Sequence, residues 1–437
     1  MLGLFYYIYF MTINTIYNFF LECSSISTDS RKITPNCMFF ALKGDHFNGN
    51  AYAKSALDNG ARYCVVDEKG FALDNHYILV DNVLKTLQEL ATIHRKSLNV
   101  PIIALTGSNG KTTTKELINS VLSTQYKTTA TKGNLNNHIG VPMTLLSMTK
   151  DTQIGIVEMG ANHHKEIKFL CNIAFPDYGV ITNFGKAHLE GFGSIEGVVK
   201  AKSELYEHLK SHNKTIFVNQ NDAVQIKQVG EYELTYTFGK NDSKGPNPTL
   251  KTSQPFVTLE YRGTIINTHL TGIYNFNNLN IAIAFGTYFK INQENIKLAL
   301  ENYIPTNNRS QFITKGTNTI LMDAYNANPT SMLAALENFK QSPEPNKVLF
   351  LGDMFELGKD APMEHQNIVN YIEEYVVANV NLIGANFFKT KTTKPFIKKY
   401  ESFEDLKSSL NTTELKKAFI LIKGSRGMAL EQVLELF

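Results

Sequence analysis

The sequence predicts an α/β protein of three domains: a small N-terminal α/β domain, a central parallel-sheet domain with an antiparallel edge, and a C-terminal doubly wound, Rossmann-like domain. Three observations lead to this prediction. From Ile102 onward, short apolar runs alternate with helix-length segments, which is typical of parallel sheets. Between Tyr236 and Ile273, period-two alternation with turn residues replaces that rhythm. At 437 residues, the chain also exceeds what one hydrophobic core organises.

The expected domains cover residues 1–98, 99–306 and 307–437. The first boundary falls near Asn99-Val100-Pro101, where regular alternation begins. In the N-terminal domain, strand-length apolar runs occur at Met38–Leu42, Tyr63–Val66 and Tyr77–Val80, and a helical stretch covers Ala51–Asn59. No internal repeat interrupts this order.

The first 21 residues carry no charge and need a separate interpretation. They lack a positive n-region and a small-residue cleavage site, and polar residues interrupt the apolar run. Apolar residues recur at helical spacing at Ile13, Ile16, Tyr17, Phe20 and Leu21. An amphipathic helix therefore explains the segment better than a membrane span, and we expect translation to start at Met11 rather than Met1, with residues 1–10 as an extension.

The remaining elements follow from apolar runs and helical spacing. Predicted strands of the central domain are Ile102–Thr106, Ile154–Glu158 and Tyr178–Thr182, and its helices are Thr112–Leu122, Ile195–Leu209 and Phe276–Tyr288. Predicted strands of the C-terminal domain are Thr319–Asp323, Val348–Gly352, Val380–Gly384 and Phe419–Lys423. Each is separated from the next by a helix-length segment, as in a doubly wound sheet.

Charge and cysteine content exclude several classes of protein. A formal net charge of +3, with no basic stripe, does not imply a nucleic-acid partner. The four cysteines stand far apart without a C-x-x-C pair, which argues against a disulfide framework and a zinc site. We therefore expect reduced thiols in a cytoplasmic protein.

The strongest local signal is the loop Gly107-Ser108-Asn109-Gly110-Lys111-Thr112-Thr113, which joins a buried strand to a helix. Backbone N–H groups in such a turn face phosphate oxygens, while the lysine reaches the β- and γ-phosphates and the first threonine can bind Mg²⁺. The standard P-loop places a glycine where this chain has Leu105. We predict an ATP-binding loop; the alternative is a glycine turn that binds nothing.

Three further residues stay ambiguous when judged by themselves. Glu158 ends a predicted strand beside the phosphate loop, where it is either a Mg²⁺ ligand or an exposed glutamate. His188 follows another strand, and a lone loop histidine is more often structural or solvated. Lys202 lies on a predicted helix and resembles any surface lysine.

At these positions the sequence resembles the Mur ligases. The segment Thr106–Thr113 is similar to the family's ATP loop, including its shortened glycine spacing. The resemblance implies a magnesium ligand at Glu158, a second-metal ligand at His188, and a carbamylated lysine at Lys202. It thus implies ATP, two Mg²⁺ ions held by Thr112, Glu158, His188 and Lys202, and catalytic roles for Lys111, His188 and Lys202.

Downstream motifs extend this resemblance to the nucleotide. Gly272–Asn278 resembles the G-x-H-N-x-x-N adenine segment, with Tyr274 in place of the histidine. The resemblance implies nucleotide contacts from Gly107, Ser108, Asn109, Gly110, Lys111, Thr112, Thr113, Asn275, Asn278, Arg309 and Asp323.

More specific stretches resemble the family members that add D-alanyl-D-alanine. These are Asp323–Met332, Leu351–Gly358, Lys423–Met428 and, facing the muramoyl peptide, Gly133–Pro142. Thr28–Arg31 and Phe39–Gly44 resemble the UDP-sugar domain, in which Asn48-Gly49-Asn50 replaces the usual Asp-Gly-His. The substrate-binding residues implied are Ser30, Arg31, Lys43, Asn134, Asn136, Asn137, Asn326 and Asn328.

The implied reaction is ATP-dependent. The terminal carboxylate of UDP-N-acetylmuramoyl-tripeptide (UDP-MurNAc-tripeptide) is phosphorylated, and the amine of D-alanyl-D-alanine (D-Ala-D-Ala) attacks the acyl phosphate to form the peptidoglycan precursor UDP-MurNAc-pentapeptide. The expected enzyme is a monomer without a membrane span. Which residue occupies the third position of the tripeptide, diaminopimelate or lysine, stays open, as does the base that deprotonates the amine.

Three other classes of protein would share only part of this set of motifs. Another Mur-type or folylpolyglutamate-type amide ligase would share the ATP loop but not the Asp323–Met332 stretch. A generic P-loop ATPase or kinase would need no UDP-sugar domain. A degenerate nucleotide-sugar-binding module would need neither Lys111 nor Lys202.

Overall fold

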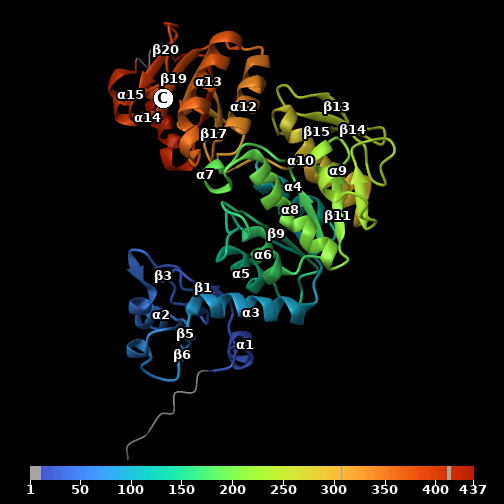
Figure 1. Ribbon diagram of the computed structural model, residues 1–437, viewed down its shortest axis with the longest axis vertical. Helices are drawn as coiled ribbons and strands as arrows, with labels where there is room; N and C mark the ends of the chain where they lie inside the picture. The colour runs from blue at the N-terminus through green and yellow to red at the C-terminus, as the bar shows by residue number, and fades with distance from the viewer. Residues whose placement is uncertain (1–10, 307, 411–414) are drawn as a thin grey trace, which may run out of the picture. The chain divides into compact units, whose positions relative to one another are not determined.

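The computed structural model describes residues 11–306, 308–410 and 415–437 and has the predicted α/β fold, with parallel sheets in three regions of the chain (Figure 1). The expectation of an upstream extension at residues 1–10 lies outside the described residues. Two compact units are distinguished: the first runs to Ala104 and includes Tyr126–Gly160 and Ile167–Tyr178, and the second contains the rest. The domain boundaries at residues 98 and 306 stay predictions.

The N-terminal sheet has four parallel strands in the order β1-β2-β5-β6. The strands are β1 (Ile26–Ser27), β2 (Met38–Phe40), β5 (Tyr63–Val66) and β6 (Tyr77–Leu79), and a small antiparallel pair joins β3 (Lys43–Gly44) to β4 (Phe47–Asn48). The helices are α1 (Ile13–Leu21), α2 (Ala53–Asp58) and α3 (Val83–Leu98). Helix α1 is amphipathic as predicted, because it buries Ile16 and Phe20 and exposes the polar Asn14, Thr15 and Asn18, although Leu21 at its end is exposed rather than on the apolar face. Helix α3 was not predicted.

The central sheet has six strands in the order β12-β11-β10-β7-β9-β8. The strands are β7 (Ile102–Thr106), β8 (Thr128–Ala130), β9 (Ile154–Glu158), β10 (Tyr178–Ile181), β11 (Thr215–Asn219) and β12 (Thr235–Phe238). The helices are α4 (Lys111–Leu122), α5 (Gly140–Leu146), α6 (Glu166–Ala174), α7 (Leu189–Phe192), α8 (Ile195–Ser211), α9 (Ala223–Val229), α10 (Ile273–Tyr288) and α11 (Gln293–Glu301). Every residue of β7 and β9 is buried, as expected for central strands of a parallel sheet.

The antiparallel strands form a sheet of their own, which corrects the prediction that they extend the parallel sheet as its edge. This sheet contains β13 (Thr249–Thr252), β14 (Thr258–Tyr261) and β15 (Thr264–Asn267). The first residues of the period-two region instead belong to β12, which pairs with β11 in parallel. The following Gly245-Pro246-Asn247-Pro248 segment contains two residues without a backbone N–H and separates β12 from β13.

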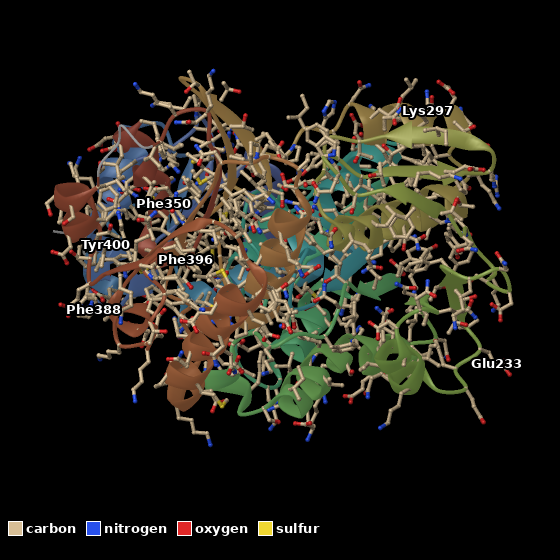
Figure 2. All side chains as sticks on the ribbon, turned by 90° about the horizontal axis from the view of Figure 1, so that it is seen from above. Glu233, Lys297, Phe350, Phe388, Phe396 and Tyr400 are labelled. Atoms are coloured by element: carbon tan, nitrogen blue, oxygen red, sulfur yellow. The ribbon has the colours of Figure 1, made fainter. Side chains whose placement is uncertain are left out.

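The C-terminal sheet has the order β16-β17-β21-β18-β19-β20, parallel except for β16. Its strands are β16 (Gln311–Lys315), β17 (Asn318–Asp323), β18 (Lys347–Gly352), β19 (Asn379–Ile383), β20 (Ile397–Tyr400) and β21 (Phe419–Lys423), and its helices are α12 (Pro329–Gln341), α13 (Ala361–Tyr375), α14 (Ala385–Phe388) and α15 (Phe403–Ser409). Phe350 and Tyr400, both labelled in Figure 2, belong to its apolar core. Because β21 lies between β17 and β18, the carboxyl ends of these three strands are neighbours.

Within the described residues, no helix combines the length and apolarity needed to cross a bilayer.

Candidate nucleotide and acceptor site

The predicted phosphate loop lies between β7 and α4 as a turn that requires glycine at two positions. Gly107 has φ +147°, and a side chain there would bring a Cβ atom within 2.0 Å of the Thr182 hydroxyl oxygen. Gly110 has φ +77° and precedes the first residue of α4, Lys111. The loop therefore opens directly onto the N-terminus of a helix, where backbone N–H groups favour an anion.

Residues that follow β10 hold the backbone of this loop. The Asn109 N–H donates to Asn183 Oδ1 at 3.0 Å, and the Asn109 carbonyl accepts from Thr182 Oγ1 at 2.6 Å and Asn183 Nδ2 at 2.9 Å. The Ser108 hydroxyl donates to the Gly185 carbonyl and accepts from the Gly185 N–H, both at 2.9 Å. The loop conformation is thus set by contacts that do not require a ligand.

The Lys111 side chain folds back over the phosphate loop. Its ammonium donates to the Gly107 carbonyl at 2.8 Å and to the Ser108 carbonyl at 3.4 Å. Thr112, the next residue, is buried with 6% exposure. Lys111 is therefore partly buried against the loop backbone, and Thr112 is largely shielded from solvent.

Lys202 is fully buried, which the sequence alone did not indicate. Its ammonium donates to the Ala161 carbonyl at 3.1 Å and lies 5.1 Å from the centre of the Phe192 ring. Burial, and secondarily the charge of Lys111, lowers the pKa of Lys202 well below its usual value of 10.5. The interior position thus favours the neutral amine.

His188 precedes α7 in a left-handed conformation, with φ 53°. Its Nδ1 lies 2.6 Å from Oε2 of Glu356, a residue of the Leu351–Gly358 stretch. This short contact with the His188 ring lowers the pKa of the Glu356 carboxyl. Sequence reasoning placed Glu356 in a motif but did not assign it a partner.

Glu158 belongs to the first compact unit and lies at the end of β9. It is 1% exposed, which rules out the alternative of a solvated strand-end glutamate. Asn136 Nδ2 donates to its Oε1 at 2.8 Å, so that two predicted site residues are in contact. Asn137 has a local role, since its Oδ1 accepts from the N–H groups of Ile139 and Gly140 at the start of α5. Asn134 is exposed.

The predicted UDP-sugar residues are at the surface of the N-terminal sheet. Arg31 is ion-paired with Asp29 and 86% exposed, and that contact lowers the pKa of Asp29 to about 2. Ser30, between them, is partly buried. Lys43 forms ion pairs of 2.9 Å with Asp67 and Glu68.

The Asn48-Gly49-Asn50 turn is tied to the same carboxylates as Lys43. Asn48 Nδ2 donates to Glu68 at 3.0 Å, and Asn50, which is fully buried, donates to Asp67 at 2.9 Å. The replacement of Asp-Gly-His thus preserves an ordered turn through amide contacts.

The predicted adenine segment begins helix α10, which packs against α4. Asn278 Nδ2 donates to Asn275 Oδ1 at 2.8 Å, while Asn278 Oδ1 accepts from the Thr114 hydroxyl at 3.1 Å. Both asparagines are buried. They therefore link the nucleotide helix α4 to α10.

Tyr274 and Arg309 lie at the junction that leads into the C-terminal sheet. The Tyr274 hydroxyl is 3.1 Å from the Ser310 hydroxyl, and burial raises the pKa of Tyr274 above its usual value. The Arg309 guanidinium lies 3.5 Å from the centre of the Tyr325 ring.

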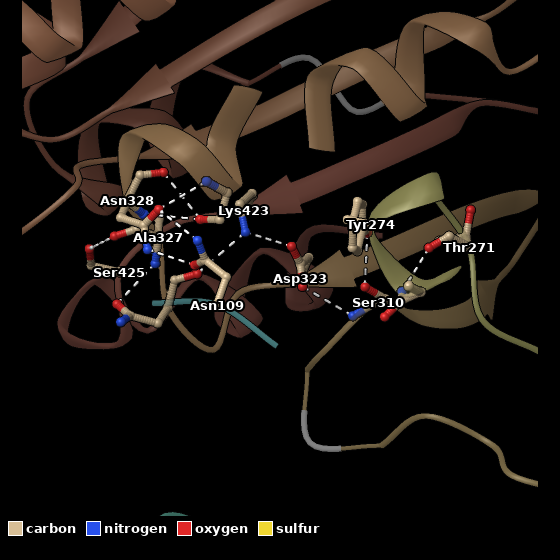
Figure 3. Close-up of polar contacts among 12 residues, drawn as sticks. Asn109, Thr271, Tyr274, Ser310, Asp323, Ala327, Asn328, Lys423 and Ser425 are labelled. Carbon is tan, nitrogen blue, oxygen red and sulfur yellow. Dashed lines mark hydrogen bonds and ion pairs between the residues drawn. The ribbon is translucent and has the colours of Figure 1, made fainter. Parts of the chain in front are cut away.

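Asp323 and the asparagines that follow β17 form a connected polar cluster (Figure 3). Asp323 accepts from the Ser310 N–H at 3.1 Å and from the Lys423 ammonium at 2.5 Å. Lys423 ends β21, is 2% exposed, and also contacts the Asn326 carbonyl at 3.4 Å. Asn328 Nδ2 donates to Asn109 Oδ1 at 2.7 Å, which joins this cluster to the phosphate loop.

Among the described residues, no group of three or more His, Cys, Asp and Glu side chains is arranged to hold a metal ion. The metal ligands implied by the resemblance include a threonine and a modified lysine, so they do not depend on such a group.

Known protein families and individual proteins are similar to this chain along nearly its whole length. Three family models cover it: "Mur ligase family, catalytic domain" at residues 22–101, "Mur ligase middle domain" at 105–286, and "Mur ligase, glutamate ligase domain" at 308–426. A Bacillus subtilis protein named UDP-N-acetylmuramoyl-tripeptide–D-alanyl-D-alanine ligase is 34% identical, over 94% of this chain and 92% of the relative.

Solved structures give the same result. MurF from Acinetobacter baumannii superimposes with a TM-score of 0.84 at 27% identity, over 97% of this chain and 98% of that one. MurF from Thermotoga maritima, solved in complex with ADP, gives a TM-score of 0.80 at 26% identity, over 96% and 97%. With the loop, the buried Lys202 and the three mainly parallel sheets in place, and with family models and relatives that match along its length, the chain belongs to the Mur ligase family.

Proposed function

We propose that this chain is an ADP-forming ligase that joins D-Ala-D-Ala to UDP-MurNAc-tripeptide through an acyl phosphate, producing UDP-MurNAc-pentapeptide. The observation that carries the proposal is the preformed loop Gly107–Thr113, with Lys111 over its carbonyls, in a chain that aligns along its length with ligases of that name. The relative crystallised with ADP supports ATP as the nucleotide.

The loop and Lys111 account for the first half of the reaction. ATP phosphates would be held by the backbone N–H groups at the start of α4, and the Lys111 ammonium would exchange its loop carbonyls for phosphate oxygens. Phosphoryl transfer depends mainly on positioning and charge stabilisation, so no enzyme nucleophile is needed. The substrate carboxylate attacks the γ-phosphorus, ADP leaves, and the amine of D-Ala-D-Ala then displaces phosphate from the acyl carbon.

The predicted ligand set fits Mg²⁺. Thr112 and Glu158 supply buried oxygen donors of the kind that this hard cation prefers, and His188 and a carbamate at Lys202 would complete sites for two ions. When bound, Mg²⁺ would neutralise phosphate charge as the two anionic groups approach. Asn136, which holds the Glu158 carboxylate, would orient it.

Carbamylation of Lys202 is favoured by the same burial that lowers its pKa. The neutral amine nitrogen attacks CO₂, a C–N bond forms, and one N–H proton passes to solvent, which leaves an anionic carbamate in place of a buried cation. We expect Lys202→Ala to lose most activity and CO₂-depleted buffer to weaken the wild type. A ¹³C signal from protein equilibrated with ¹³C-bicarbonate, absent in the variant, would report the modification; a fully active Lys202→Ala protein would contradict the assignment.

The remaining substrate contacts follow the chain from its N-terminal to its C-terminal domain. We assign Ser30, Arg31 and Lys43 to the UDP moiety, Asn134, Asn136 and Asn137 to the muramoyl peptide, Asn275, Asn278, Arg309 and Asp323 to the nucleotide, and Asn326 and Asn328 to D-Ala-D-Ala. We also propose a monomer that works in the cytoplasm, where ATP is available.

The function is tested by incubating purified protein with ATP, Mg²⁺, D-Ala-D-Ala and UDP-MurNAc-tripeptide, in separate reactions with diaminopimelate or lysine at the third position. UDP-MurNAc-pentapeptide, detected by mass, should appear with one ADP per product, and Lys111→Met should abolish it. ATP hydrolysis without the pentapeptide, or product only with another amine, would instead favour the alternative of another Mur-type or folylpolyglutamate-type ligase.

A further inference from the structure

The phosphate loop and the acceptor segment Asn326–Asn328 are joined by a direct pair of side-chain amides. Asn328 Nδ2 donates to Asn109 Oδ1 at 2.7 Å, and Asn109 Nδ2 approaches Asn328 Oδ1 at 3.5 Å, although 219 positions separate the two residues (Figure 3). Asn328 is only 7% exposed, whereas Asn109 is partly buried. A buried amide that loses its hydrogen-bond partner destabilises the folded protein, so the Asn328 side chain favours the arrangement in which it meets Asn109.

The Asn109 end of the pair is fixed before any contact with Asn328 is made. Its backbone N–H and carbonyl are both engaged by Thr182 and Asn183. The side chain therefore leaves the loop from a set position.

The Asn328 end is fixed as well, because Asn328 is the N-cap of α12. Its Oδ1 accepts from the Ser331 N–H at 2.9 Å, and its own N–H donates to the Ser331 hydroxyl at 3.1 Å, a complete capping box. The Asn328 side chain thus contacts both the start of helix α12 and the phosphate loop.

A second connection runs alongside the first. The Lys186 N–H donates to Thr330 Oγ1 at 2.9 Å in the first turn of α12, and the adjacent Gly185 holds the Ser108 hydroxyl of the loop. Both connections end on the first turn of α12. The loop is therefore linked to the start of α12 directly through Asn109 and indirectly through Gly185 and Lys186.

We infer that Asn109 is a positioning residue for the second substrate: through Asn328, the nucleotide loop sets the geometry of the Asn326–Asn328 segment that binds the incoming amine. This inference rests on the proposed function and deepens it, since it makes the site for D-Ala-D-Ala dependent on the state of the nucleotide loop. Asn109 would act without touching the dipeptide itself.

The test is a double-mutant cycle in the ligase assay with Asn109→Ala, Asn328→Ser and the double variant. Serine preserves the N-cap of α12 but is too short to reach Asn109. Each variant should raise KM for D-Ala-D-Ala by about tenfold, and the double variant should show no more than either alone. In Asn328→Ser, which leaves the phosphate loop intact, KM for ATP should change less than about twofold, as should the acyl phosphate trapped with hydroxylamine when the dipeptide is left out.

Asn338→Ala is the matched control, because Asn338 is equally buried on α12 and contacts Thr271 and Gln254 away from the loop. It should lower thermal stability without changing KM for the dipeptide. Additive effects of Asn109→Ala and Asn328→Ser, or a rise in KM for ATP alone, would overturn the inference. A wild-type protein that makes no pentapeptide would instead overturn the proposed function.

Discussion

Arg95 gives a prediction whose size can be worked out from its contacts. This helix α3 residue has an 8% exposed side chain that donates to three acceptors: the Ala174 carbonyl at 2.9 Å, the Phe175 carbonyl at 3.0 Å, and Asp177 Oδ2 at 2.7 Å. The two carbonyls belong to the end of helix α6. Asp177 also accepts from the Ile102 N–H at 3.0 Å, where β7 begins.

Arg95→Met should therefore be strongly destabilising. It removes three charge-assisted hydrogen bonds and leaves the partly buried Asp177 carboxylate without its counter-charge, a change that costs about 3–5 kcal/mol when a buried partner is deleted. Arg95→Lys keeps the charge but not the planar fork, so we expect roughly half of that loss.

The assay is urea unfolding followed by circular dichroism, with free energies of unfolding from linear extrapolation. Arg62→Met is the matched control, since Arg62 forms a 2.5 Å ion pair with Glu22 but is 42% exposed. Exposed pairs contribute about 0–1 kcal/mol. If Arg95→Met lowered the free energy of unfolding no more than Arg62→Met, the assignment of Arg95 as a buried residue that holds α6 and Asp177 in place would be wrong.

Three other predictions concern pH, the loop and the junction to the C-terminal sheet. Burial lowers the pKa of His365 below its usual value of 6.5, so below about pH 6.5 the unfolded chain binds more protons than the folded one. The free energy of unfolding should therefore fall as the pH drops from about 6.5 to about 5.5, and it should fall less in His365→Gln, as measured by urea titrations at both pH values. An equal fall in the variant would show that His365 does not cause it. Gly107→Ala should weaken ADP binding by about 100-fold in calorimetry, because its Cβ would clash with Thr182. Gly133→Ala, where φ is +54° and the space is open, should leave the affinity for ADP unchanged. Equal effects of the two substitutions would refute the steric argument. Tyr274→Phe should lower the free energy of unfolding by about 1 kcal/mol, since it deletes one buried hydroxyl contact, and an unchanged value would show that this contact contributes nothing.

Most elements of the fold could be predicted because their signals are local. The strands at Ile102–Thr106 and Tyr63–Val66 are apolar runs whose ends coincide with turn residues, and the structure confirms both. Helix α3 was missed although it buries Leu87 and Leu90 at helical spacing. Strand β20 (Ile397–Tyr400) was missed because its pairing with β19, rather than its own apolar content, defines it.

The site residues show the same difference between local signals and contacts made only in the folded chain. The loop Gly107–Thr113 was predictable because a glycine turn between strand and helix is a continuous motif. Lys202 was not, since its neighbours in the sequence do not reveal that Phe192 and Ala161 enclose it. Nor could the chain order show that Glu356 lies against His188.

By itself, the sequence determined the succession of strands and helices, the nucleotide loop and the family, because each depends on residues that are adjacent or one helical turn apart. Only the tertiary structure decided which polar side chains are buried and which partners they meet. Asn109 and Asn328 illustrate the reason: each belongs to a recognisable motif, but the contact between them exists only once 219 positions of chain have folded to bring them together. Burial and pairing are properties of that folded arrangement.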